Sequence, residues 1–150
     1  MNDSETRDVT EPDMGGGGSR PRVGIAHGIL RIVAGLMFWQ HGAQKLFGWL
    51  GGMGRDGGSV PWFSWPVGVA GMLEFFGGIL IVVGLFTRHV AFVLAGEMAV
   101  VFWWRHSPNA FWPIQNRGEL PILFCFIFLF MWVAGPGRFS LDGLRGRSTD

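Results

Sequence analysis

With 150 residues the chain has the length of one domain, but its composition differs from that of soluble domains. Apolar residues make up 49% of it and charged residues only 15%, against roughly 25% charged in soluble domains. The net charge of +1, without a basic cluster, excludes a nucleic-acid partner. The lone Cys125 excludes an intrachain disulfide and a C-x-x-C redox pair, so packing is the role expected for its side chain.

Four apolar segments follow a polar N-terminal stretch. Residues 1–22 carry mixed charges and four consecutive glycines, which predicts a disordered tail. Each apolar segment is close to the roughly 20 residues with which a helix crosses hydrocarbon, and the segments cover about residues 25–47, 66–86, 90–106 and 118–135. The short link Thr87–His89 makes the second and third helices an antiparallel hairpin. The sequence therefore predicts an all-α membrane protein, an antiparallel four-helix bundle over residues 23–137 with a C-terminal tail at 138–150.

The basic residues predict how this bundle is oriented in a bacterial inner (plasma) membrane. Cytoplasmic flanks carry an excess of lysine and arginine, and here one side collects seven of these residues and the other four. Both termini are therefore expected in the cytoplasm. The richer side has Arg7, Arg20, Arg22, Arg88, Arg138, Arg145 and Arg147; the other has Lys45, Arg55, Arg105 and Arg117. Six tryptophans fall at the outer boundary: Trp49, Trp62, Trp65, Trp103, Trp104 and Trp112.

Polar residues at membrane depth are the candidates for function, because each charge there costs roughly 3 kcal/mol on insertion scales. His41, Gln44 and Lys45 share one face of the first helix, and Glu74 lies in a strip of glycines on the second. His41 and Glu74 are expected at similar depth in the outer half of the bundle. The candidates for ligand binding or proton handling are His41, Gln44, Lys45, Glu74 and Glu119, and those for charge pairing are Arg31, Glu97 and Arg105.

Each candidate also has a structural interpretation. His41 could simply hydrogen-bond across helices, and Glu119 could form a capping box in which Asn116 is the N-cap. Haem b would need two histidines on facing helices at one depth; only His41 and His106 approach this, and His106 sits at the interface, which disfavours haem. No H-E-x-x-H motif or Cys/His cluster is present, so no metal site is predicted.

Four short motifs resemble those of one family. Arg31–Leu46 resembles the opening helix of the DoxX family, with its H-G-x-x-K-L signature at His41–Leu46. The other matches follow in order, and they are Glu74–Gly78 with Gly84–Arg88, Asn116–Leu120, and Gly135–Asp142. The resemblance covers about residues 23–142. It implies a bacterial inner-membrane four-helix protein associated with oxidoreductase systems, including quinone-linked thiosulfate oxidation.

Two functions remain open at this point. The first is a small membrane subunit of a redox system that binds quinone in the outer half of the bundle, where histidine or carboxylate groups would exchange its protons. The second is a non-catalytic membrane scaffold or small-molecule carrier. Whether the chain is itself an enzyme stays open; if so, it would be part of a quinone-linked oxidoreductase complex. The expected partners are the lipid bilayer, redox proteins and further copies of the chain.

Overall fold

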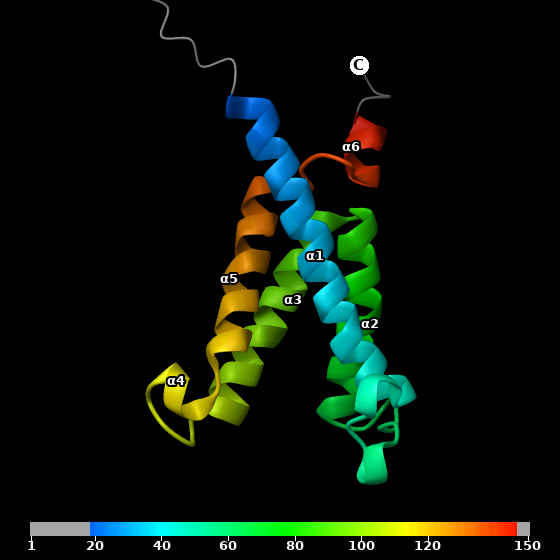
Figure 1. Cartoon of the computed structure of the whole chain (residues 1–150), viewed down its shortest axis with the longest axis vertical. Helices are drawn as coiled ribbons and strands as arrows, with labels where there is room; N and C mark the ends of the chain where they lie inside the picture. Colours follow the sequence, from blue (N-terminus) through cyan, green and yellow to red (C-terminus); the bar gives the residue numbers. More distant parts are fainter. Residues whose placement is uncertain (1–18, 147–150) are drawn as a thin grey trace, which may run out of the picture.

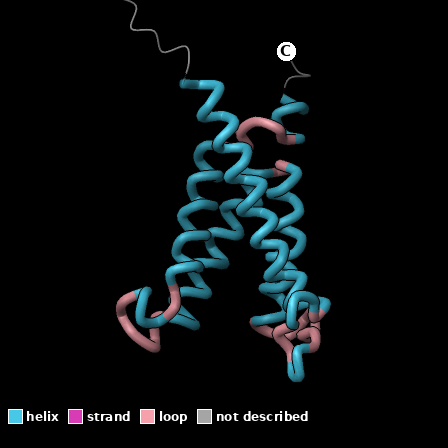
Figure 2. Tube along the Cα trace, viewed as in Figure 1, coloured by secondary structure: helices cyan, strands magenta, loops and turns pink. Residues whose placement is uncertain are grey.

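The computed structural model describes residues 19–146, and this part of the chain folds into helices and loops without a strand (Figure 1, Figure 2). The predicted all-α fold is confirmed. The long helices are α1 (Ser19–Phe47), α2 (Val67–Val83), α3 (Thr87–Val101) and α5 (Glu119–Ala134). A π-helical turn, η3 (Phe102–His106), continues α3, and the short elements are η1 (Trp49–Gly51), η2 (Arg55–Gly57), α4 (Pro113–Asn116) and α6 (Leu141–Gly146).

The helix bounds differ from the predicted ones mainly at the ends. α1 begins at Ser19, so residues 19–22 of the expected tail are helical, while residues 1–18 lie outside the described part. α2 ends at Val83 because Gly84 takes a left-handed conformation (φ 69°), and α3 starts only three residues later. The link between them is therefore Gly84–Phe86 rather than Thr87–His89. The segment after residue 138, expected as a tail, contains α6.

The long helices form two pairs that meet at one end and diverge at the other. α1 packs against α2, and α3 packs against α5, with fewer contacts between the pairs. Figure 1 shows both pairs closest near the start of α1 and α6, which we call the terminal end, and farthest apart near η1, η2 and α4, which we call the loop end. The shared core lies between the pairs and contains Ala34, Phe38, Ile81, Ala91, Leu94, Ala95, Met98, Phe124, Phe128 and Met131, with the half-buried Cys125 against it.

Glycines allow the backbones of α1 and α2 to touch. A Cβ atom on Gly42 would lie 2.3 Å from the backbone nitrogen of Phe75, and one on Gly78 would lie 2.7 Å from that of Trp39. Side chains larger than hydrogen cannot fit at these positions without separating the helices. This close approach fixes which residues of α1 and α2 stand opposite each other.

Much of the outer surface is apolar. α1 contains a stretch, Arg22–Phe47, that is long and apolar enough to cross a membrane by length and composition, while the apolar helices α2 and α5 are shorter, with 17 and 16 residues. Large hydrophobic side chains also face outward on α2 and α5, among them Phe76, Ile79, Leu123, Phe126 and Val133.

Candidate functional site

An ion pair joins α1 to α2 near the loop end. The ammonium Nζ of Lys45 lies 2.5 Å from Oε1 of Glu74, whose side chain is buried with 3% of the residue exposed. Gly71 lies one turn before Glu74, and a Cβ there would be 3.0 Å from Cβ of Lys45. The small residue thus lets Lys45 run along α2 to reach the carboxylate.

A small cavity lies beside this ion pair, and all four long helices line it. Its volume is about 110 Å³. His41 of α1 and Glu74 of α2 supply its polar lining, so the structure brings together the two residues predicted at similar depth. The apolar lining comes from α1, α3 and α5 and consists of Phe38, Met98, Val101, Leu120, Pro121 and Phe124.

Glu97 lies level with Glu74 across the α2–α3 hairpin. Gly77 contacts Leu94, since a Cβ on Gly77 would come within 2.8 Å of the leucine side chain. In an antiparallel pair of helices, three residues toward the start of one helix and three residues toward the end of the other cover the same distance along the pair. From Gly77 on α2 and Leu94 on α3, these steps lead to Glu74 and Glu97. Both carboxylate oxygens of Glu97 are buried without a hydrogen-bond partner, as is Oε2 of Glu74. Glu97 interacts electrostatically with Glu74 and Lys45.

These four residues, His41, Lys45, Glu74 and Glu97, form what we call the buried polar cluster. Its two carboxyl groups, one ammonium and one imidazole are all groups that can give or take protons. From the sequence alone, Glu97 is predicted only as a charge-pairing residue. The signal that would have placed it in the cluster is the short turn, because Glu74 and Glu97 are almost equally far from Phe86 in the sequence.

The other site candidates lie outside this cavity. The amide Nε2 of Gln44 donates a hydrogen bond to the carbonyl of Leu50, at 3.4 Å, and Glu119 and Arg105 are exposed. The predicted capping box is wrong, because Gly118 is the N-cap of α5 and no side chain caps that helix. Asn116 instead accepts a hydrogen bond from the backbone N–H of Gly118 and donates one to the carbonyl of Ala110.

Arg31 donates its hydrogen bonds to backbone carbonyls, and the carboxylate with which its charge interacts is that of Asp142 at the terminal end. Its fully buried guanidinium donates hydrogen bonds to the carbonyl oxygens of Ile81 and Val82 at the end of α2. It also donates to the carbonyl of Phe139 at 2.8 Å. The last carbonyls of a helix have no partner within the helix, so a buried arginine can satisfy several of them at once. Arg31 therefore ties α1, α2 and the segment after α5 together at the terminal end.

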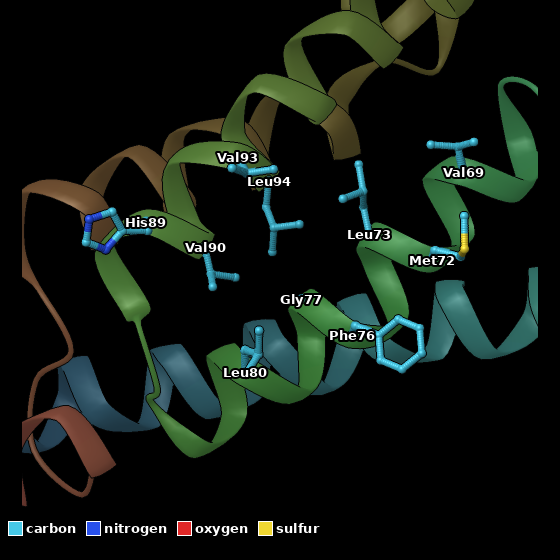
Figure 3. A pocket seen from close by; sticks show the side chains of 10 residues that line it. All are labelled: Val69, Met72, Leu73, Phe76, Gly77, Leu80, His89, Val90, Val93 and Leu94. Atoms are coloured by element: carbon cyan, nitrogen blue, oxygen red, sulfur yellow. The ribbon is translucent and has the colours of Figure 1, made fainter.

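A second, larger cavity lies between α2 and α3 (Figure 3). It has a volume of about 400 Å³ and is open to the outside. Figure 3 shows His89 at one end and Val69 with Met72 at the other. Its lining is apolar except for His89, and it also includes Leu73, Phe76, Gly77, Leu80, Val90, Val93 and Leu94. We call it the α2–α3 groove.

Within residues 19–146, no group of three or more His, Cys, Asp or Glu side chains is placed to hold a metal ion. His106, which together with His41 was the nearest approach to a haem pair, has its Nδ1 2.9 Å from the carbonyl oxygen of Asn116.

These features define a helical protein with apolar outer faces and a polar cluster inside. The chain belongs to the DoxX family, whose model matches residues 26–107, so the family predicted from the sequence motifs is confirmed. Proteins of this family are membrane-associated. The matched range contains all four residues of the buried polar cluster. The chain is also similar to an uncharacterized protein of Haemophilus influenzae, with 40% identity over 118 residues that cover 75% of this chain and 85% of the relative. No solved structure matches it.

Proposed function

We propose that this DoxX-family protein crosses the bacterial inner membrane four times, with the terminal end in the cytoplasm. The outward hydrophobic side chains of α2 and α5 support this, because a helix that is apolar all round needs protein or lipid on every side. With η3 added, the helix that starts at Thr87 reaches His106, close to the roughly 20 residues that a span requires. The terminal end carries Arg88, Arg138 and Arg145, as a cytoplasmic face would.

Within this membrane protein, the buried polar cluster would serve a redox system by exchanging protons with a quinone. The observation that carries this proposal is that His41 and Glu74 line one cavity while Glu97 lies level with Glu74. Reduction and oxidation of a quinone take up and release protons at its two oxygens, and histidine and carboxylate groups are suited to that exchange. The chain would act as a subunit, and a redox partner protein would supply or remove the electrons.

The sizes of the two cavities suggest how a quinone would lie. Sites for whole small molecules usually measure about 300–1,000 Å³, so the cavity of about 110 Å³ beside His41 would take only the carbonyl edge of a ring. The α2–α3 groove, at about 400 Å³ and with an almost wholly apolar lining, suits an isoprenoid chain. A ligand with a small polar head and a long apolar tail matches this combination better than a compact polar molecule does.

The test is quinone binding by the purified protein. We would measure quinone co-extracted with the protein in detergent, and then titrate the protein in lipid nanodiscs with a short-chain quinone. Glu74→Gln should fold because Glu97 remains available to Lys45, and His41→Asn should fold because it leaves the Lys45–Glu74 ion pair in place. Both variants should lose quinone binding. Glu119→Gln removes an exposed carboxylate at the same end and is the matched control. Folded variants that bind quinone as the parent does would refute the proposal.

The second candidate is a non-catalytic membrane scaffold or carrier. It is favoured by the Lys45–Glu74 ion pair, which joins α1 to α2 and could serve assembly alone. In that case Glu74→Gln should fold and leave the function of the protein unchanged, because Glu97 can replace Glu74 beside Lys45. Removing both acids in Glu74→Gln with Glu97→Gln would strand the charge of Lys45, at a cost of about 3–5 kcal/mol, and adding Lys45→Met should restore the folded yield. Measuring folded yield beside quinone binding separates the two functions.

A further inference from the structure

The buried polar cluster has more acidic groups than its one lysine can neutralise. Lys45 is ion-paired with Glu74, and Glu97 stands at the same level with both oxygens buried and unpartnered. An ionised carboxylate without a partner is strongly disfavoured in such surroundings, where little water is available to solvate it. One additional positive charge is therefore needed in the cluster.

The neighbouring helices do not supply that charge. Facing Glu97 across the hairpin, α2 offers only Glu74, and α1 offers Lys45 and His41. His41 lies one turn from Lys45 on α1, where a second cation would be repelled. On α5, the residues of the cavity beside the cluster are Leu120, Pro121 and Phe124, which carry no charge. In η3, Arg105 is exposed and His106 contacts the carbonyl of Asn116.

We propose that Glu97 holds a proton at neutral pH and is the group through which the buried polar cluster gives and takes protons. The proton comes from a hydronium ion in the solvent, whose O–H bond breaks to leave water, and a new O–H bond forms on the carboxylate of Glu97. Lys45 keeps the shared negative charge on Glu74, because its ammonium donates to Oε1 of that residue. The proton-carrying role of Glu97 rests on the proposed function and deepens that function by naming the group that carries the proton.

Two close carboxyl groups titrate together, so the proton belongs to the pair and its position is set by Lys45. This arrangement makes the number of bound protons depend on the whole cluster. If Glu74 loses its charge, Lys45 can pair with Glu97, which then ionises. If Lys45 loses its charge, both carboxyl groups should become protonated.

Infrared spectroscopy of the purified protein in nanodiscs without quinone tests these outcomes. The parent should show the C=O band of a protonated carboxylic acid at neutral pH, with a shift in heavy water. The band should disappear in Glu97→Gln and also in Glu74→Gln, and Lys45→Met should show a second protonated group. Glu119→Gln, the control, should keep the band unchanged. Because two separate variants remove the band, the test holds even where one of them fails to fold.

Three results would overturn the inference. The band could be absent from the parent, or it could persist in folded Glu97→Gln, and in either case Glu97 does not hold the proton. It could also disappear when sodium chloride replaces choline chloride, which would show that a sodium ion supplies the charge. Quinone binding is measured separately on the parent protein. A parent that shows the band but binds no quinone would refute the proposed function alone, and a parent that binds quinone but lacks the band would refute the role of Glu97 alone.

Discussion

The carboxylate of Asp142, in α6, caps the start of α3, because its Oδ2 accepts a hydrogen bond from the backbone N–H of Thr87 at 2.8 Å. Its Oδ1 accepts another from the N–H of Phe86 at 2.9 Å, and the N–H of Asp142 donates to the carbonyl of Gly84. Partial burial by itself would raise the pKa of Asp142, but the hydrogen bonds from Thr87 and Phe86, together with the nearby charge of Arg145, outweigh it, and the pKa lies below its usual value. The segment after α5 is thus bound to the α2–α3 turn.

Asp142→Ala should lower the free energy of unfolding by about 1 kcal/mol, as the loss of a helix cap usually does. Asp142→Asn, which keeps one acceptor oxygen, should lose less. Because the pKa of Asp142 is lowered on folding, this residue stabilises the folded protein above its unfolded pKa of about 3.9. The stabilisation is lost as the pH falls through the pKa of the folded state. Thermal unfolding in detergent, measured at neutral and acidic pH, should show the parent and Asp142→Ala converging in acid. Asp56→Asn, in an exposed loop, is the control; a constant difference at all pH values would contradict the capping role.

Arg31→Lys should destabilise the protein although it keeps the positive charge. The planar guanidinium reaches carbonyls of α2 and of the segment after α5, and an ammonium on a shorter chain cannot reach all of them. Each buried carbonyl left without a partner costs about 1–3 kcal/mol. Thermal unfolding should therefore show a clear decrease for Arg31→Lys and none for Arg22→Lys, an exposed arginine on the same helix. Equal stability of the two variants would show that Arg31 acts through its charge alone.

The sequence predicts the four long helices and brings two residues of the site together. The other contacts of the site cannot be predicted from it, for reasons that differ from residue to residue. The apolar segments gave all four long helices, and the depth estimate brought His41 and Glu74 together because both lie on helices with regular rise. The hydrogen-bond partners of Arg31 cannot be predicted from the sequence, because they are backbone carbonyls and no residue pattern marks them. The capping box failed because Arg117 adopts a left-handed conformation (φ 59°) and separates Asn116 from α5. Glu97 is predicted as a charge-pairing residue, and its position level with Glu74 follows only from the register of α2 and α3 across the short turn.

Gly42→Ala should separate α1 from α2, whereas Gly96→Ala should be tolerated. A Cβ on Gly42 would lie 2.3 Å from the backbone nitrogen of Phe75, and backbone atoms cannot move aside as a flexible side chain can. Overpacking of this kind costs about 1–3 kcal/mol. Gly96 on α3 has nothing within 4 Å of the added atom, and alanine there should stabilise the helix by up to about 1 kcal/mol. Thermal unfolding of the two variants side by side is the measurement; a loss of stability in Gly96→Ala equal to that in Gly42→Ala would mean that the glycines serve another purpose.

Single cysteines can test the proposed orientation in whole cells. Cys125 is the one cysteine of the chain and packs half-buried beside the core, so Cys125→Ser should fold as the parent does and provide a cysteine-free background. In that background, Ser59→Cys lies in the exposed segment between α1 and α2, and Ser148→Cys lies near the C-terminus.

A maleimide that cannot cross the membrane should label Ser59→Cys in intact cells and label Ser148→Cys only after the cells are opened. The physical reason is the distribution of arginine and lysine, because the terminal end carries the excess that retains a segment in the cytoplasm. Reporter fusions at Asp150 and within Gly51–Ser59 should agree. If both cysteines were labelled in intact cells, an odd number of spans would be required and the four-span proposal would fall. If only Ser148→Cys were labelled, the orientation would be reversed, and the buried polar cluster would lie in the cytoplasmic half of the bundle, where its protons would exchange with the cytoplasm.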